Sequence, residues 1–255
     1  LIDGQLVEGA KTIEIVNPAT GRPFTTAPAA SEDQLNAAVA AARRAFPAWA
    51  ATPWDERRNC LLLFAQRLEE EVEDFANLLV KEQGKPLAEA RFEVGATLQG
   101  IRYYASAELG AETRSHANGS YEIERRPLGV VAAITPWNYP LILASNKFSP
   151  ALLTGNTVVL KPAPTTPLTS LELGRLASEI FPAGVFNVIA DDNDLGSILT
   201  GHPDIAKISF TGSTGTGKRV MHGAAETLKR VTLELGGNDP AIVLKDADVD
   251  GAAQG

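Results

Sequence analysis

The second half of the chain alternates short apolar runs with longer segments in which apolar residues recur at helical spacing. The runs are rich in valine and isoleucine, which is typical of strands buried on both faces of a parallel sheet. Strands are predicted at residues 129–134, 157–161, 185–189, 206–210, 230–235 and 241–244. Helices are predicted between them, for example at 141–153, 167–180 and 215–225. This order predicts an α/β fold built on a doubly wound parallel sheet.

The first half of the chain has a mostly helical pattern. Two short strands are predicted at 2–5 and 12–17, and the turn sequence Asn-Pro-Ala-Thr-Gly at 17–21 closes the second. Ser31 is a suitable N-cap for a helix that runs to Phe46. Two further helices are predicted, one long and amphipathic at 55–83 and one at 87–110. The polar segment 113–124 predicts an exposed hairpin.

Charge and composition narrow the possible functions. The 255 residues carry a formal net charge of -8 and form no dense basic patch, which argues against nucleic-acid or membrane-surface partners. No apolar run reaches the length of a membrane span. A single cysteine rules out an internal disulfide framework and fits a reducing compartment. The composition therefore predicts a soluble, cytoplasmic protein.

Four polar side chains lie at the carboxyl ends of predicted strands: Asn138, Lys161, Ser213 and Glu234. Because these ends meet at one edge of a parallel sheet, the four residues should share one crevice. Taken alone, Asn138 would more often cap the helix at 141–153, and Glu234 would more often make a surface ion pair. Their combination favours a functional site. The three histidines have no metal-ligand spacing, so no metal site is predicted.

Residues 212–218, Gly-Ser-Thr-Gly-Thr-Gly-Lys, lie between a predicted strand and a predicted helix. Their glycine and lysine spacing is that of a phosphate loop, which directs backbone N–H groups at phosphate oxygens. Arg219, however, stands where such a loop carries a magnesium-binding serine or threonine. Two interpretations stay open: a phosphate-loop NTPase, and a helix N-terminus that binds a pyrophosphate with help from Ser213. The usual dinucleotide fingerprint Gly-x-Gly-x-x-Gly is missing, so any Rossmann-like fold here is a variant form.

Four segments together resemble the aldehyde dehydrogenase superfamily. They are Pro-Trp-Asn-Tyr-Pro at 136–140, Leu-Lys-Pro-Ala-Pro at 160–164, Phe-Thr-Gly-Ser-Thr at 210–214 and Leu-Glu-Leu-Gly-Gly at 233–237. The resemblance covers essentially the whole chain, but only about the first half of a full-length member. It implies a variant Rossmann-like, NAD(P)-binding domain at 1–237 with N-terminal helices and an oligomerisation hairpin at 113–127. Residues 238–255 would then be the start of a truncated catalytic domain.

The resemblance also implies catalytic roles for three residues. Asn138 is similar to the amide that donates a hydrogen bond to the oxyanion of the tetrahedral intermediate. Glu234 is similar to the general base that activates water, and Lys147 to a lysine near the catalytic centre. The implied reaction is the oxidation of a small-molecule aldehyde to a carboxylic acid with NAD or NADP.

Cofactor-binding positions follow from the same resemblance. Trp137 and Ser213 would contact the pyrophosphate, and Thr135 and Lys161 the adenosine side. The remaining positions are Pro136, Ala163, Pro164, Gly196, Phe210, Thr211, Gly212, Thr216, Gly217, Leu235 and Gly236. Family members that prefer NAD commonly carry a glutamate where this chain has Pro164. Because proline cannot accept hydrogen bonds from the ribose, the choice between NAD and NADP stays open.

The nucleophilic cysteine of the family comes after the segment 233–237, and no cysteine follows that segment here. Cys60 lies in a predicted amphipathic helix and is expected to be a core residue. We therefore expect these 255 residues to be a truncated form that folds and turns over no aldehyde. The full-length protein is expected to be a homo-oligomer, a dimer or a tetramer. The alternative is a stand-alone nucleotide-binding or assembly module.

Overall fold

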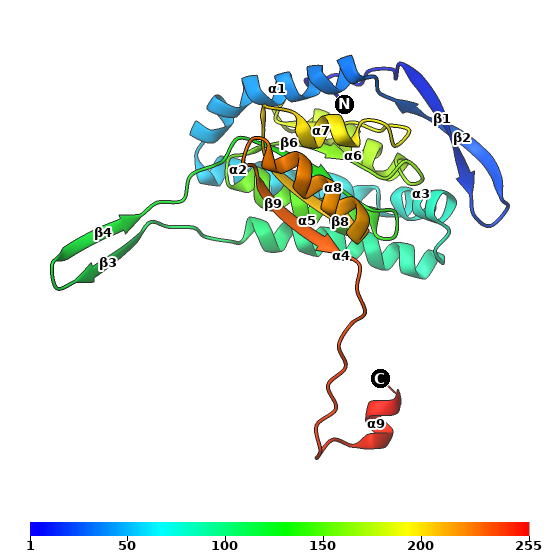
Figure 1. Ribbon diagram of the computed structural model, residues 1–255. Coiled ribbons are helices and arrows are strands. Elements are labelled where there is room, and N and C mark those ends of the chain that lie inside the picture. Colours follow the sequence, from blue (N-terminus) through cyan, green and yellow to red (C-terminus); the bar gives the residue numbers. More distant parts are fainter. Residues whose placement is uncertain (255) are drawn as a thin grey trace.

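A five-stranded parallel sheet forms the centre of the computed structural model, which describes residues 1–254 (Figure 1). Its strands are β5 (Val130–Ile134), β6 (Thr157–Lys161), β7 (Phe186–Val188), β8 (Ile205–Gly212) and β9 (Arg230–Leu235). They lie in the order β7-β6-β5-β8-β9, and every neighbouring pair is parallel. The chain therefore winds outward from β5 in both directions, which confirms the predicted doubly wound sheet.

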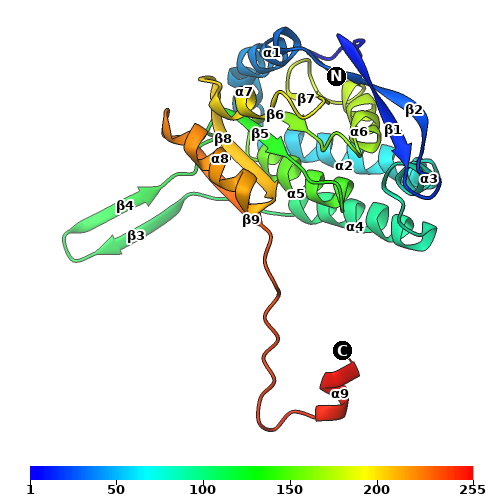
Figure 2. The ribbon, with the colours of Figure 1, turned by 45° about the vertical axis from the view of Figure 1, so that its right-hand side comes forward.

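Helices cover both faces of this sheet (Figure 2). On one face lie α2 (Trp54–Glu70), α3 (Val72–Gln83), α4 (Leu87–Ala105), α5 (Pro140–Leu153) and α6 (Leu168–Ser178). On the other face lie α1 (Glu32–Ala51), α7 (Gly196–Gly201) and α8 (Thr214–Ala225). Alternate residues of each strand face opposite cores, as strand geometry requires. In β5, Val131 and Ala133 belong to the first core and Val130 and Ala132 to the second.

Two helix N-termini on the first face are capped by buried glutamates from other helices. Glu82, near the end of α3, accepts hydrogen bonds from the first two backbone N–H groups of α6 at 2.7 and 3.0 Å. Glu93, on α4, accepts hydrogen bonds from the N–H groups of Leu141 (2.9 Å) and Ile142 (3.4 Å) at the start of α5. A carboxylate in this position satisfies donors that have no partner within the helix, and it interacts favourably with the helix dipole.

Two antiparallel hairpins lie outside the central sheet. β1 (Lys11–Asn17) and β2 (Arg22–Ala29) are joined by the predicted turn, in which the Gly21 N–H donates to the Asn17 carbonyl at 2.8 Å. β3 (Glu112–His116) and β4 (Gly119–Ile123) form a polar hairpin that projects from the body of the protein (Figure 1). The predicted exposed hairpin is confirmed.

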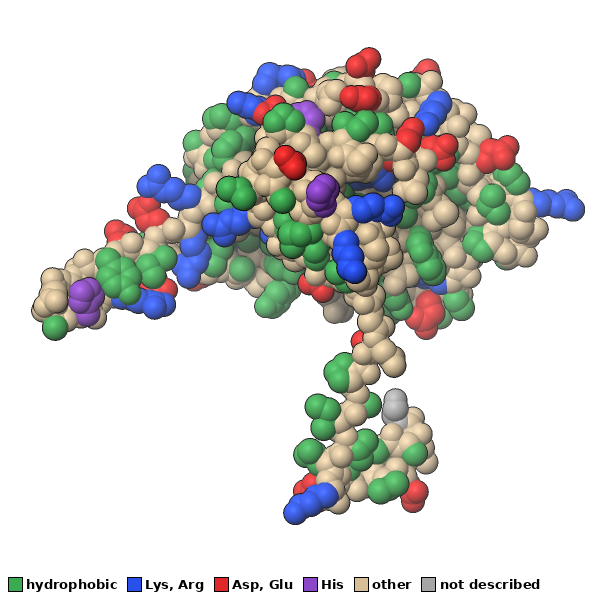
Figure 3. Space-filling model, in the orientation of Figure 1, with side chains coloured by type: hydrophobic (Ala, Val, Ile, Leu, Met, Phe, Trp, Pro, Cys, Tyr) green, Lys and Arg blue, Asp and Glu red, His purple; other side chains and the backbone are tan. Residues whose placement is uncertain are grey.

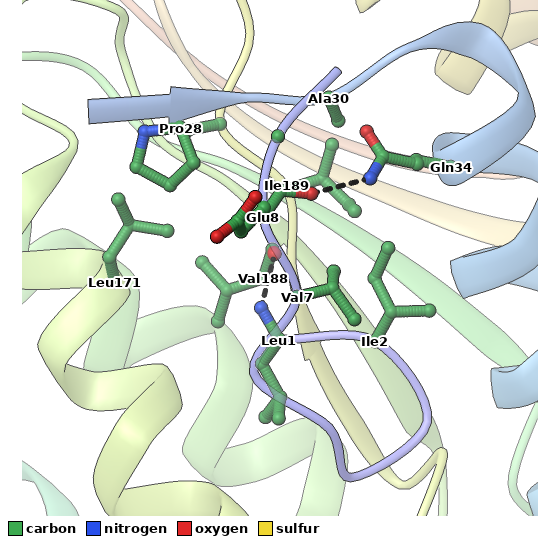
Figure 4. Close-up of a pocket in the computed structure, with 12 residues that line it drawn as sticks. Leu1, Ile2, Val7, Glu8, Pro28, Ala30, Gln34, Leu171, Val188 and Ile189 are labelled. Atoms are coloured by element: carbon green, nitrogen blue, oxygen red, sulfur yellow. Dashed lines mark hydrogen bonds between the residues drawn. The ribbon is translucent and has the colours of Figure 1, made fainter. Parts of the chain in front are cut away.

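The segment before β1 covers the outer edge of β7 (Figure 4). The amino group of Leu1 donates to the Val188 carbonyl at 3.1 Å, and the Val188 N–H donates back to the Leu1 carbonyl at 3.0 Å. Covering an edge in this way removes unpaired backbone groups that would otherwise pair with another chain.

The first and last predicted strands are wrong. Residues 2–5 form a tight turn, in which Asp3 and Gly4 both have positive φ values of 51° and 77°. Residues 241–244 have no regular secondary structure, and Ile242 and Leu244 are 83% and 67% exposed. The positive φ values at Asp3 and Gly4 turn the chain back on itself, so Ile2 bridges to Gln5. An apolar run becomes a strand only where a neighbouring strand pairs with it, and residues 241–244 have no such neighbour in the described part of the chain.

Helix boundaries also differ from those predicted. The helix expected at 55–83 is two helices, α2 and α3, because Glu71 has a non-helical backbone with φ −115° and ψ 21°. The capping of α1 by Ser31 is confirmed, but α1 continues past Phe46 to Ala51 with Pro47 inside it. The helix expected at 87–110 ends at Ala105. Neither β2 nor α7 was predicted.

After β9 the chain leaves the sheet as an irregular segment and then forms α9 (Val249–Gln254). No residue of α9 is buried, and Figure 3 shows several apolar side chains on this terminal segment facing solvent. Among residues 1–254, none of the helices combines the length and the apolar character that crossing a membrane requires.

Candidate functional site

The carboxyl ends of β5, β6, β8 and β9 meet at one edge of the sheet. Ile134, the last residue of β5, is in register with Lys161 of β6 and with Phe210 of β8. Thr211, next along β8, is in register with Glu234 of β9. The segments that follow these strands therefore begin side by side. They do so where the strand order changes direction, which is where open α/β sheets bind ligands.

Lys147 and Glu234 lie on the same face of the sheet, the face covered by α5. Phe210 and Leu233 pack into the core on the α8 side, so the alternate residues Thr211 and Glu234 point to the opposite side. Lys147 donates from Nζ to the Thr211 hydroxyl at 2.7 Å. Burial lowers the pKa of Lys147 to about 8, and the negative charge of Glu234 opposes this shift. A lysine with a lowered pKa thus lies within electrostatic reach of the candidate base.

Asn138 lies in the loop between β5 and α5, and its side chain is exposed. The interpretation of Asn138 as a helix cap is wrong. The N-cap residue of α5 is Tyr139, no side chain of the loop caps the helix, and Glu93 accepts the first hydrogen bonds instead. The Asn138 amide is therefore left available at the sheet edge, on the face where α5 begins.

The backbone of this loop is held by Lys85, which follows α3. Its ammonium group pairs with the Glu93 carboxylate, donates to the Asn138 carbonyl at 3.0 Å, and lies 4.2 Å from the centroid of the Tyr139 ring. The side chain of Glu93 is fully buried, and that of Lys85 is 8% exposed. A single buried ion pair thus fixes both the start of α5 and the loop before it. Neither residue was predicted from the sequence, although a glutamate on the buried face of a helix is a recognisable signal.

The glycine-rich segment forms a helix start and not a phosphate loop. Ser213 is the N-cap of α8, accepting from the Thr216 N–H at 3.2 Å, and the helix begins at Thr214. Lys218 is consequently an exposed residue in the second turn of α8. A phosphate loop instead needs these residues to wrap around the phosphate before the helix begins. The phosphate-loop NTPase interpretation is therefore wrong, and an anion-binding helix N-terminus remains.

The glycines of α8 serve two purposes. A Cβ on Gly217 would lie 2.5 Å from a Leu235 methyl carbon, so this glycine allows α8 to pack closely on β9. A Cβ on Gly215 would meet nothing within 4 Å, so the backbone there is open to an approaching ligand. The first turn of α8 can therefore admit a phosphate group close to its N–H groups.

At the other end of the sheet edge, Lys161 is paired with Asp191, which follows β7. The two side chains are 2.6 Å apart and almost fully buried. Nearby, the buried hydroxyl of Thr135 has no hydrogen-bond partner among residues 1–254. Buried hydroxyls are usually satisfied, so this one is suited to a ligand.

The remaining predicted cofactor positions lie along the same edge at different depths. Trp137, Leu235 and Gly236 are exposed; Pro136, Ala163, Pro164, Gly196, Gly212 and Thr216 are partly buried; Gly217 is buried. The Phe210 ring is also buried, and a Cβ on Gly212 would lie 2.6 Å from it. The Phe210 ring therefore packs against the backbone just before α8, and it has no face open to a ligand.

Other features do not compete with this site. A separate hollow beside the N-terminal segment is lined by apolar groups such as Leu171 and Val188, and none of the predicted site residues lines it (Figure 4). Cys60, on α2, packs partly against the first core, and burial raises the pKa of its thiol, which makes it a poor nucleophile. Within the described part of the chain, no group of acidic, histidine and cysteine side chains is arranged to hold a metal ion.

Comparison with known proteins gives a consistent result. The model of the aldehyde dehydrogenase family matches residues 6–255. The chain is 45% identical over 234 residues to aldehyde dehydrogenase LUC3 of a Fusarium species, covering 92% of this chain and 50% of that protein. It is 41% identical over 265 residues to succinate-semialdehyde dehydrogenase (NADP+) GabD of Escherichia coli, covering 100% of this chain and 55% of that protein.

A solved structure shows the same fold. The crystal structure of PnpE in complex with nicotinamide adenine dinucleotide matches with a TM-score of 0.92 and 40% sequence identity, covering 100% of this chain and 54% of the other. The chain thus spans about half the length of the relatives that it matches.

Proposed function

Since the chain belongs to the aldehyde dehydrogenase family, we propose that it is the dinucleotide-binding part of an enzyme that oxidises an aldehyde to a carboxylic acid. The observation that carries this proposal is the arrangement at the sheet edge. Lys147 and Glu234 lie on the α5 face of the sheet, Asn138 is in the loop just before α5, and α8 begins at the same edge of the sheet. A stand-alone binding module would give the first three residues no role.

Each of the three residues has a distinct task in this proposal. The Asn138 amide donates a hydrogen bond to the oxyanion that forms when a thiolate adds to the aldehyde, and one such donor changes the rate by about 100- to 1,000-fold. Glu234 accepts a proton from the water that releases the acid. Lys147, through its charge and its hydrogen bond to Thr211, adjusts the electrostatic potential around Glu234. Cys60 does not supply the thiolate, because it lies on α2 within the packed helices.

NAD or NADP fits the remaining residues, and when bound it accepts the hydride from the substrate. The N–H groups at the start of α8 and the Ser213 hydroxyl suit a pyrophosphate, and the exposed Trp137 offers an apolar surface beside it. The orphan hydroxyl of Thr135 suits a ribose hydroxyl, and Lys161 ends the neighbouring strand. The crystal structure of PnpE in complex with nicotinamide adenine dinucleotide and the NADP+ in the name of GabD support this class of cofactor.

We further propose that residues 1–237 form the dinucleotide-binding domain and that 238–255 begin a second, catalytic domain. The change from the packed sheet to an exposed terminal segment after β9 supports this division. We also propose that the longer protein is a homo-oligomer, with the hairpin of β3 and β4 as its contact. That hairpin projects from the body, and its residues are almost all exposed (Figure 1).

Titration with NAD and with NADP, followed by tryptophan fluorescence, tests the binding proposal. Trp137 is 59% exposed at the site while Trp49 is buried, so a bound dinucleotide should change the emission of Trp137. We expect saturable binding of at least one dinucleotide with Kd below about 1 mM, corresponding to about 4 kcal/mol. The variant Trp137→Phe should lose the fluorescence change. No binding of either dinucleotide at several millimolar, with the fold intact by circular dichroism, would contradict the proposal.

A further inference from the structure

Lys161 and Asp191 form an ion pair that the proposed function does not require. Lys161 ends β6, and Asp191 lies three residues after β7. Lys161 Nζ is 2.6 Å from Asp191 Oδ1, and the two side chains are 5% and 0% exposed. Asp191 Oδ2 accepts a hydrogen bond from the Leu195 N–H at 2.8 Å, just before α7. Asp191 Oδ2 thus holds the Leu195 N–H, while Oδ1 accepts no hydrogen bond from the described residues and compensates the lysine through its charge alone.

This ion pair lies where the adenosine end of a bound dinucleotide is expected. That placement of the dinucleotide rests on the proposed function. The reacting end must lie near Asn138 and Glu234, over β5, β8 and β9. With the phosphates at the start of α8, the opposite end extends toward β6 and β7, since neighbouring strands are only about 4.8 Å apart. Lys161 and Asp191 lie at the carboxyl ends of these two strands.

The adenosine ribose carries the only difference between NAD and NADP, a 2′-phosphate with about two negative charges. An unpaired lysine at this place would attract that phosphate. Here the charge of Lys161 is already compensated by Asp191. The loop that contains Asp191 carries three carboxylates within four residues, those of Asp191, Asp192 and Asp194. Of these, Asp194 is balanced by Lys11 at 2.7 Å, whereas Asp192 is exposed. Pro164, on the neighbouring loop, provides neither a charge nor a side-chain hydrogen bond.

We propose that Asp191 selects NAD over NADP by holding the ammonium group of Lys161 in a buried ion pair and keeping it from a 2′-phosphate. The 2′-hydroxyl of NAD is neutral, so it loses nothing when the lysine charge is compensated. Discrimination between the cofactors therefore rests on an aspartate after β7, in a chain that has Pro164 after β6.

The test compares the binding of NAD and NADP to the whole 255-residue chain by fluorescence titration. The wild type should bind NAD at least about tenfold more tightly than NADP, a difference of one decade in Kd. Asp191→Asn keeps an oxygen for the Leu195 N–H but frees the lysine, and it should tighten NADP binding about tenfold while changing NAD binding less than about threefold. Asp192→Asn is the matched control, because it removes an equal charge from the exposed neighbour, and it should change both affinities less than about threefold.

A double variant tests whether Asp191 acts on NADP binding through Lys161. Lys161→Gln together with Asp191→Asn replaces the ion pair by a neutral one, so the ratio of NADP affinity to NAD affinity should stay as low as in the wild type. The inference is overturned if the double variant binds NADP as tightly as Asp191→Asn does, or if Asp191→Asn and Asp192→Asn shift the ratio equally.

Two further outcomes are distinct from one another. The comparison of NAD and NADP binding to the wild type needs no variant, so it tests the inference even if Asp191→Asn fails to fold. If the wild type binds NADP as tightly as NAD, the inference is overturned and the proposed function stands. Failure of the wild type to bind either dinucleotide overturns the proposed function, and the inference with it.

Discussion

Buried charged residues determine the local geometry of this site more than the residues at its surface do. Asn138 can present its amide only because Glu93 performs the capping and Lys85 holds the loop carbonyl. Leaving either partner of such a buried pair alone typically costs about 3–5 kcal/mol. A site residue recognised by its motif is thus positioned by residues that no local motif contains.

Glu82 gives a prediction on pH dependence. Burial is the main cause that raises the pKa of Glu82 to about 7 from 4.5, against the hydrogen bonds from Thr169 and Leu168 that lower it. The folded state therefore binds more protons than the unfolded state between these values, so stability falls as pH rises. The stabilisation that protonated Glu82 gives the folded state is fully present below pH 4.5 and is lost as pH rises through about 7. The loss amounts to about 3 kcal/mol.

The variant Glu82→Gln keeps an acceptor for the N–H groups of α6 and should remove this slope in urea unfolding between pH 4.5 and 7.5. Glu73→Gln, on the same helix, is the control, since it changes an exposed carboxylate and should leave the slope in place. A slope that is unchanged in Glu82→Gln would show that another group is responsible.

At the scale of elements, close approach of backbones sets where the helices can lie against the sheet. Gly184, in the turn before β7, has a φ of 78°, and a Cβ there would lie 2.5 Å from the Ala41 carbonyl oxygen of α1. The contact fixes the distance between α1 and the amino end of β7. A related contact occurs where Gly217 of α8 packs against the Leu235 side chain of β9. Glycines at such contacts are required by tertiary packing, and the local sequence does not reveal them.

The variant Gly184→Ala should therefore destabilise the chain by about 2–4 kcal/mol, since left-handed backbone strain adds to overpacking against a main-chain oxygen. Gly21→Ala is matched in backbone conformation, with a φ of 65°, but a Cβ there would meet nothing within 4 Å. It should lose only about 1 kcal/mol from backbone strain. Equal losses in thermal or urea unfolding of the two variants would show that the contact with α1 is not needed.

At the scale of the whole molecule, the packed body and the terminal segment differ in kind. The body has two cores separated by the sheet, whereas residues 241–254 expose Ile242, Val243, Leu244 and Val249. Side chains that bury nothing contribute little to the free energy of unfolding, but an exposed apolar run promotes association.

Removal of residues 241–255 should change the thermal midpoint by less than about 2 °C and reduce the binding of an apolar dye such as ANS. Replacing Ile242, Val243 and Leu244 by serine in the intact chain is the control, and it should reduce dye binding to the same extent. A fall in the midpoint of more than about 5 °C on truncation would show that the segment packs on the body.

The positions of the five strands of the central sheet, its doubly wound form, the capping of α1 by Ser31 and the turn after Asn17 were determined by sequence alone, because each depends on periodicity or on neighbouring residues. The same holds for the set of residues at the strand ends, since parallel strands bring their carboxyl ends to one edge whatever else the fold does.

Tertiary structure alone decided the remainder. Residues 241–244 have the pattern of a strand but no partner, and the pattern 55–83 does not reveal the break at Glu71. The caps of α5 and α6 come from other helices, and Lys161 meets a carboxylate 30 positions further along the chain. Such contacts depend on which surfaces meet when the chain folds. The local sequence pattern does not show which residues far apart in the chain will meet.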